Sequence, residues 1–138
     1  SLNAGKNFMS SASAKRETST RSRYGENWRN VSRFVETVTP SKLGVACIDL
    51  DSVLIFHNHA DGISHLGHPL RLGRKLCQLL KRRGYRVVVL TSRPNSQHQQ
   101  IYTYLIVREF PIDEVTNMKP PADMYCDDKA IRIPKNWK

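Results

Sequence analysis

The stretch "LGVACIDLD", residues 43–51, is a nearly continuous apolar run that ends in two aspartates one residue apart. A run of this kind, partly β-branched, is expected for a parallel strand that is buried on both faces. Residues two apart on an extended chain point to the same side, so the carboxylates of Asp49 and Asp51 repel each other unless something compensates them. The stretch therefore predicts a central strand with a compensating charge near its carboxyl end.

The chain after this strand alternates between helix and strand patterns. Leucines on one stripe with basic residues opposite predict an amphipathic helix over residues 68–84, with Gly84 as its C-terminal cap. The elements expected next, in chain order, are a strand over 85–94, a helix over 96–110, and short strands over 113–116 and 123–128. Alternating strands and helices predict an α/β fold with right-handed crossovers and a central parallel sheet covered by helices on both faces.

The second of these helices has a start signal and a stop signal. Asn95 or Ser96 is expected to cap its first turn, since short polar side chains accept hydrogen bonds from the free N–H groups there. Pro111 is expected to end it, because proline cannot continue a helix.

The first third of the chain has a different character. Residues 1–25 are rich in Ser, Thr, Lys and Arg without an apolar period, and we expect a disordered basic tail, an added leader before Met9, or a targeting segment. Residues 26–42 predict an amphipathic helix and linker, with the helix over 26–40 laid on the core or docking a partner. Residues 43–138 are expected to form the folded domain.

Composition limits the classes of protein. The chain has 138 residues and a net charge of +10, which suits a nucleic-acid partner, an anionic substrate or mere solubility. Residues 1–43 hold eight Lys/Arg against three Glu, so half of this excess lies outside the expected core, which weakens the nucleic-acid interpretation. No apolar run is long enough to cross a membrane, and three scattered cysteines without a CxxC motif indicate reduced thiols and a cytoplasmic location.

Polar side chains follow each of the four predicted strands. Because ligands of open α/β sheets bind beyond the carboxyl ends of the strands, these side chains are expected to converge on one crevice. They are Asp49, Asp51, Thr91, Ser92, Lys119, Asp127 and Asp128.

The types of these residues are complementary. Clustered carboxylates without nearby Cys or His ligands suit Mg²⁺, while a hydroxyl and a lysine can hold the oxygens of a phosphoryl group. One aspartate of the Asp49 and Asp51 pair could attack phosphorus, and the other could protonate the leaving oxygen. The pattern therefore indicates phosphoryl transfer.

Four motifs in this order resemble the haloacid dehalogenase superfamily of phosphotransferases. Its D-x-D-x-[TV] motif corresponds to "DLDSV" at 49–53, and its strand ending in Ser or Thr corresponds to "VVVLTSRP" at 87–94. Its lysine corresponds to Lys119 in "NMKPPAD", and its acidic pair to "MYCDD" at 124–128. The resemblance covers roughly residues 43–133 and is closest to small members from phages, bacteria and capsular polysaccharide biosynthesis. It implies a three-layer Rossmann-like fold without a cap domain.

The resemblance also implies a role for each residue of the reaction. Asp49 would be the nucleophile and Asp51 the general acid/base of a phosphomonoester hydrolase with an aspartyl-phosphate intermediate. Thr91 would bind the phosphate, with Ser92 as the less favoured hydroxyl. Lys119 would stabilise the phosphate and the nucleophile.

The metal site is implied in the same way. Asp49, the backbone carbonyl of Asp51, and Asp127 would hold Mg²⁺, with Asp128 assisting. One residue departs from the family pattern, because Ser52 stands where glycine is usual and would have to adopt an angle that glycine adopts more easily.

Several simpler interpretations of these residues stay open. Asp127 and Asp128 could begin a turn, Lys119 could be a surface lysine, and Thr91 could bond its own backbone. Arg93 is interpreted as a solvated charge, or as a contact for an anionic substrate. The histidine loop, residues 57–68, is expected to border the crevice, with one histidine near the substrate, rather than to bind a second metal.

The predicted function is a capless, Mg²⁺-dependent phosphatase. An open crevice would admit a sugar phosphate, a nucleotide or a nucleic-acid end. Two alternatives remain: a catalytically weak binding or regulatory module that keeps the fold, and a nucleic-acid-binding protein that acts through its basic tail and "KRRGYR" at 81–86.

Overall fold

The computed structural model describes residues 25–62 and 64–137, so the expectations for residues 1–24 lie outside the described part. The chain divides into two units between Val38 and Thr39. In the first unit residues 25–37 are helical, which confirms the helix expected over 26–40. Its placement on the core or against a partner stays a prediction, as do the domain boundaries.

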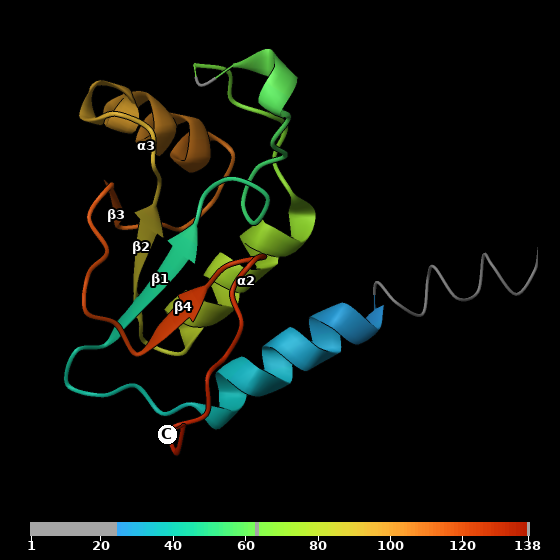
Figure 1. Ribbon diagram of the computed structural model, residues 1–138, viewed down its shortest axis with the longest axis vertical. Helices are drawn as coiled ribbons and strands as arrows, with labels where there is room; N and C mark the ends of the chain where they lie inside the picture. The colour runs from blue at the N-terminus through green and yellow to red at the C-terminus, as the bar shows by residue number, and fades with distance from the viewer. Residues whose placement is uncertain (1–24, 63, 138) are drawn as a thin grey trace, which may run out of the picture. The chain divides into compact units, whose positions relative to one another are not determined.

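The second unit contains a four-stranded parallel sheet, as the alternating pattern predicts (Figure 1). Its order is β3-β2-β1-β4, and the strands are β1 Val45–Asp49, β2 Arg86–Leu90, β3 Glu114–Thr116 and β4 Met124–Cys126. β1 pairs with β2 on one side and β4 on the other, with Asp49 opposite Leu90. The three inner residues of β1 are buried, as expected for a central strand. The fold is therefore α/β, and the three-layer arrangement stays a prediction.

Helix α2, Arg71–Arg82, connects β1 to β2 and passes behind β1 and β4 in Figure 1. Its buried residues form one stripe that includes Leu76, Leu79 and Leu80. The N–H of Gly84 donates to the Lys81 carbonyl, and the next N–H donates to the Leu80 carbonyl. Gly84 has φ +89° and ends the helix in a Schellman motif, so the predicted cap is confirmed.

Helix α3, His98–Val107, connects β2 to β3 and has different ends from those expected. Asn95–Gln97 form the short 3₁₀ helix η2, and no side chain caps either η2 or α3, so the predicted Asn95 or Ser96 cap is wrong. α3 ends at Val107 because Glu109 adopts φ +66° and redirects the chain before Pro111 is reached. No described helix has the length and apolar character needed to span a membrane.

The connection from β1 to α2 is a long loop held close to the sheet. Its only regular element among the described residues is the 3₁₀ helix η1, His59–Asp61. Phe56 stacks on His68 with ring centroids 5.0 Å apart, and the Tyr104 hydroxyl on α3 donates to the Gly67 carbonyl at 2.5 Å. A Cβ at Gly67 would lie 1.7 Å from the Phe56 carbonyl oxygen, so only glycine fits there. This packing holds the histidine loop next to the carboxyl end of β1.

The three cysteines lie in or next to the core. Cys47 and Cys77 are buried, Cys126 is half-buried, and none of them forms a disulfide. Burial raises the pKa of Cys77 and of Cys126 to about 12, because it disfavours the charged thiolate. It also raises the pKa of Cys47.

Candidate functional site

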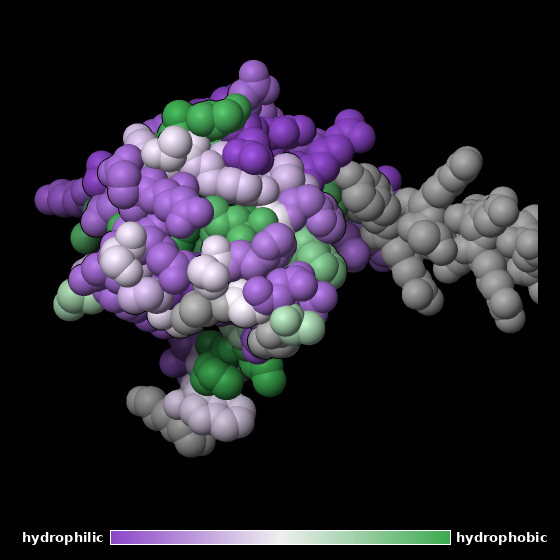
Figure 2. Space-filling view, turned by 90° about the horizontal axis from the view of Figure 1, so that it is seen from above, coloured by the Kyte–Doolittle hydropathy of each residue, from purple (hydrophilic) through white to green (hydrophobic). Residues whose placement is uncertain are grey.

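A cavity of about 660 Å³ lies at the carboxyl ends of the strands. All seven residues singled out in the sequence line it: Asp49, Asp51, Thr91, Ser92, Lys119, Asp127 and Asp128. Most of the surface visible from above the strand ends in Figure 1 is hydrophilic (Figure 2). The predicted convergence of these side chains on one crevice is therefore seen in the structure. What the cavity can bind depends on which of the side chains lie next to each other.

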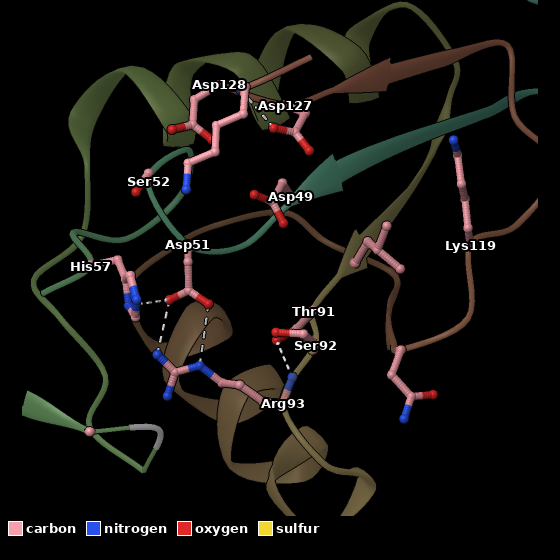
Figure 3. Close-up of a pocket in the computed structure, with 14 residues that line it drawn as sticks. Asp49, Asp51, Ser52, His57, Thr91, Ser92, Arg93, Lys119, Asp127 and Asp128 are labelled. Atoms are coloured by element: carbon pink, nitrogen blue, oxygen red, sulfur yellow. Dashed lines mark hydrogen bonds and ion pairs between the residues drawn. The ribbon is translucent and has the colours of Figure 1, made fainter. Parts of the chain in front are cut away.

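Asp49, Asp127 and Asp128 form one group, called here the aspartate cluster. Asp49 ends β1, and the other two follow β4, which is the parallel neighbour of β1, so the two strand ends bring them together (Figure 3). One carboxylate oxygen from each lies within 4.8 Å of the others. The backbone N–H of Lys129 donates to Asp127 Oδ1 at 2.8 Å and holds that carboxylate in a turn. Three oxygen ligands at this spacing suit a hard cation such as Mg²⁺.

The pKa of Asp49 also indicates that the aspartate cluster suits a cation. The pKa of Asp49 is raised from 3.8 to about 6, first by burial and then by the charges of Asp127, Asp51 and Asp128. The N–H of Leu50 opposes this rise only in part. Burial and the three charges all disfavour the ionised form, so a bound cation would relieve the repulsion and lower this pKa.

The Asp51 carboxylate lies outside the aspartate cluster and is held from the other side. Arg93 donates from Nη2 to Asp51 Oδ1 at 2.9 Å and from Nε to Oδ2 at 3.4 Å. His57 Nδ1 lies 3.3 Å from the same Oδ1. Figure 3 shows Asp51 between Asp49 and Arg93, directed toward Arg93. Two aspartates that start as neighbours in sequence therefore have different partners.

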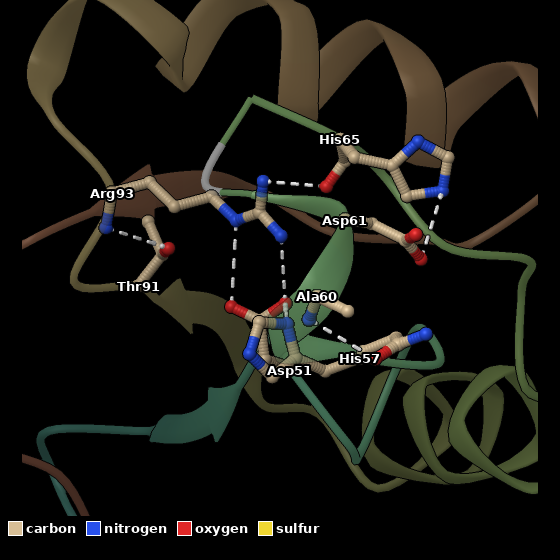
Figure 4. Close-up of polar contacts among 8 residues, drawn as sticks. Asp51, His57, Ala60, Asp61, His65, Thr91 and Arg93 are labelled. Carbon is tan, nitrogen blue, oxygen red and sulfur yellow. Dashed lines mark hydrogen bonds and ion pairs between the residues drawn. The ribbon is translucent and has the colours of Figure 1, made fainter.

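Arg93 lines the cavity but is far less exposed than one of its two interpretations requires. Its side chain is only 2% exposed, so the prediction of a solvated charge is wrong. It donates to Asp51 and also, through Nη1, to the carbonyl of His65 at 2.8 Å (Figure 4). The enclosed guanidinium therefore binds groups of the protein itself.

The two hydroxyls after β2 differ in exposure. Thr91 is 2% exposed, and its Oγ1 accepts the N–H of Arg93 at 3.1 Å, while Ser92 is exposed. The Thr91 backbone N–H donates to Thr116 on β3, which fixes its position at the strand end. Thr91 Oγ1 can still donate its own hydrogen to a ligand in the cavity.

Lys119 lies on the side of the cavity opposite Asp51 and Arg93 (Figure 3). Its Nζ stands 4.3 Å from the centroid of the Tyr125 ring, a cation–π contact. The Tyr125 hydroxyl donates to the Pro120 carbonyl at 2.6 Å, so the ring that supports the lysine is itself fixed. Within the described part of the chain, no carboxylate forms an ion pair with Lys119.

Ser52 adopts the angle that glycine would favour, with φ +70°. Its N–H donates to the Ile55 carbonyl at 2.8 Å, and the N–H groups of Leu54 and Ile55 donate to Leu50. The turn after Asp51 therefore forms in spite of the serine, at a cost of roughly 1–2 kcal/mol for a left-handed residue with a Cβ.

Two polar side chains that line the cavity, Asn117 and Lys129, were not predicted from the sequence. Asn117 directly follows β3, so the rule that strand ends carry the site would have found it. Lys129 directly follows the acidic pair and carries a second positive charge to the rim. The signal for both was their position next to a predicted strand or motif.

Three of the four histidines of the histidine loop have separate partners beside the site. His57 contacts Asp51, His65 lies 4.0 Å from Asp61, and His68 stacks on Phe56. Within the described residues, the aspartate cluster is the group arranged to hold a metal.

Comparison of the chain with protein-family models, curated proteins and solved structures finds no match.

Proposed function

We propose that this protein is a Mg²⁺-dependent phosphomonoester hydrolase of the haloacid dehalogenase type, with a three-layer fold and no cap domain. The aspartate cluster carries the proposal, because three carboxylates within 4.8 Å share a cavity with Thr91 and Lys119. This set combines oxygen ligands for a hard cation with a donor and a positive charge for phosphoryl oxygens.

The first half of the reaction uses both aspartates of the first strand end. A carboxylate oxygen of Asp49 attacks phosphorus, the bond from phosphorus to the leaving oxygen breaks, and Asp51 gives that oxygen a proton. Thr91 and Lys119 hold the phosphoryl oxygens in line for the attack. Mg²⁺ held by the aspartate cluster supplies positive charge that offsets the negative charge of the phosphoryl group and the carboxylates.

The second half releases the product. Asp51 takes a proton from a water molecule that attacks the phosphorus of the aspartyl-phosphate, and Asp49 leaves as a carboxylate together with inorganic phosphate. The longer hydrogen bond of Asp51 Oδ2 to Arg93, at 3.4 Å, leaves this oxygen as the one best able to exchange a proton.

The cavity favours phosphomonoesters whose organic part extends into solvent. No regular element other than η1 stands between β1 and α2 in the described residues, and Lys119 and Lys129 line the rim. Sugar phosphates, nucleotides and nucleic-acid ends fit this description.

A hydrolysis assay tests the proposal. Wild-type protein, Asp49→Asn and Asp61→Asn are assayed with an aryl phosphate, with Mg²⁺ and with chelator. We expect Mg²⁺-dependent release of phosphate by the wild type and by Asp61→Asn, and a loss of at least about 10³-fold in Asp49→Asn. Asp61 is the matched control, because it is an aspartate on the adjacent loop with 45% of its side chain exposed.

Two outcomes would contradict the proposal in different ways. Hydrolysis that survives Asp49→Asn would refute the covalent mechanism. No hydrolysis of any member of a broad phosphomonoester panel would refute the enzyme and favour a binding module. A phosphorylated peptide containing Asp49, recovered after acid quench of a single turnover, would support the intermediate directly.

A further inference from the structure

Arg93 is a charged side chain enclosed almost completely by the protein, and it joins three separate segments. Its guanidinium donates to Asp51 after β1 and to the His65 carbonyl in the histidine loop (Figure 4). Its backbone N–H donates to Thr91 after β2, and its carbonyl lies 3.0 Å from His98 Nε2 at the start of α3. One residue therefore spans the strand ends, the loop and a helix.

Burial of this kind needs a reason, because an enclosed charge destabilises the fold unless it is paired and hydrogen-bonded. Arg93 is 2% exposed, and it forms an ion pair with the Asp51 carboxylate, which is 22% exposed at the cavity wall. A hydrophobic residue in this position would avoid the desolvation of the guanidinium. The contact with Asp51 is therefore the feature that distinguishes Arg93 from an ordinary packing residue.

Arg93 lines the cavity, but its guanidinium is directed at groups of the protein. The side chain is 2% exposed, and the planar guanidinium fork already faces Asp51 and the His65 carbonyl. We therefore expect Arg93 to affect chemistry through the groups that it holds.

We propose that Arg93 is a positioning residue that fixes the Asp51 carboxylate for proton transfer and couples it to the histidine loop through the His65 carbonyl. This inference rests on the proposed function for its catalytic part. We call the contacts of Arg93 with Asp51 and His65 the Arg93 clamp. The same guanidinium orders the histidine loop and orients the Asp51 carboxylate, so a change that disturbs one should disturb the other.

The clamp predicts a specific kinetic signature. Proton donation matters for a poor leaving group and matters little for a good one, since a stabilised anion leaves without a proton. Loss of the clamp should therefore lower kcat/KM for a simple alkyl phosphate far more than for dinitrophenyl phosphate. A general loss of structure would lower both alike.

The first experiment compares Arg93→Lys, Asp51→Asn and the double variant on these two substrates with Mg²⁺. Lysine keeps the charge but cannot reproduce the fork. We expect Arg93→Lys to lower kcat/KM for the alkyl phosphate by about 10–100-fold, with a much smaller loss on dinitrophenyl phosphate. In the Asp51→Asn background the further loss should be less than about threefold, because the two residues act as a unit. Equal losses on both substrates, or additive losses, would overturn the positioning role.

A second experiment tests the coupling without any activity. Hydrogen exchange of the amides of residues 64–68 should be at least about tenfold faster in Arg93→Lys and in Asp51→Asn, while amides of β1 and β2 keep their protection. Asp51→Asn keeps the shape of the side chain, so it reports even if Arg93→Lys fails to fold. Unchanged exchange at 64–68 in Asp51→Asn would overturn the clamp.

Tyr104→Phe is the matched control. It removes the hydroxyl that donates to the Gly67 carbonyl, and so loosens the same loop without touching Asp51 or Arg93. We expect faster exchange at 64–68 with an unchanged leaving-group dependence. A shift of that dependence in Tyr104→Phe would assign the effect to the loop and overturn the role of Arg93. If the wild type hydrolyses nothing, the proposed function fails, and the exchange results still decide the coupling.

Discussion

Asp49 and Asp51 are separated by one residue but have opposite surroundings. Asp51 is held by Arg93 and lies near His57, whereas Asp49 faces two further carboxylates and has a pKa raised to about 6. The protein thus supplies a partner for one carboxylate and concentrates like charges around the other. A fold keeps such repulsion where a ligand is to supply the missing charge, which is why the difference marks the proposed metal position.

The largest expected effect is on the affinity for Mg²⁺. Asp127→Asn should weaken Mg²⁺ binding by about 100-fold, because it removes a charged ligand from the aspartate cluster. Asp51→Asn should weaken it by less than about threefold, since the Asp51 carboxylate already has a cationic partner. Titration calorimetry of both variants measures the difference, and equal losses would remove the distinction between the two sites.

A smaller effect, on the free energy of unfolding, is expected at Asp113, a carboxylate that lies away from the cavity and is paired with a lysine. Asp113 accepts hydrogen bonds from Lys81 and from the buried N–H of Val87. Asp113→Ala should lower the free energy of unfolding by about 2 kcal/mol, since it leaves a buried donor without its partner. Glu114→Ala is the control, because the ion pair of Glu114 with Arg86 is about half exposed and should contribute less than about 0.5 kcal/mol.

Asp113 should also make the stability of the protein depend on pH. Partial burial tends to raise the pKa of Asp113, but the bonds from Lys81 and Val87 and the charges of Lys81 and Arg86 outweigh it and lower the pKa. The folded state therefore binds this proton less readily, and the stabilisation is present above the unfolded pKa, about 4, and lost as the pH falls through the folded value. Denaturation of wild type and Asp113→Ala should converge below about pH 4, and a constant difference down to low pH would contradict the ion pair.

Asp49 should change the stability with pH in the direction opposite to Asp113. Its folded pKa of about 6 lies above the ordinary 3.8, so the folded state keeps a proton that the unfolded chain has lost, and metal-free stability falls as the pH rises between these values. Asp49→Asn should therefore stabilise the protein in chelator at pH 7.5 by about 1 kcal/mol, after allowance for solvent screening. The gain should vanish near pH 4. Thermal denaturation at the two pH values measures it, and destabilisation at pH 7.5 would contradict the repulsion.

The smallest effect is expected at Ser52, in the turn that follows Asp51. Ser52→Gly should raise the free energy of unfolding by about 0.5 kcal/mol, because relief of the left-handed strain is partly offset by the entropy of glycine in the unfolded chain. Glu109→Gly is a matched control, since Glu109 also has a positive φ, of +66°, and ends α3 away from the cavity. Both variants should gain stability in chemical denaturation, and only Ser52→Gly should change kcat. A loss of stability in Ser52→Gly would show that the serine side chain supports the turn.

The fold was predictable because its signals are local. The apolar run before Asp49, the leucine stripe of α2 and Gly84 each depend on residues close in sequence, and each is confirmed. The start of α3 was not predictable from Asn95 or Ser96, because capping competes with the 3₁₀ turn that follows Pro94. Its end was set by Glu109, a residue type that gives no local warning of a positive φ.

The candidate site was predictable in position but not in its pairings. The strand-end rule identifies seven lining residues, because parallel strands bring their ends to one edge. It cannot separate the two aspartates of "DLD", since Arg93 beside Asp51 and the two aspartates beside Asp49 lie about 40 or more residues away and depend on how side chains turn. Arg93 shows this most clearly: nothing in "TSRP" reveals that the arginine is enclosed rather than solvated.

The buried thiols have a practical consequence for labelling. Burial raises the pKa of Cys77 and of Cys126 to about 12, so little thiolate forms at neutral pH, and alkylating dyes react with the thiolate. Cys47 is enclosed and its pKa is also raised. A cysteine introduced at an exposed loop position such as Ser64 would therefore take up a fluorophore selectively, with the three native cysteines left in place.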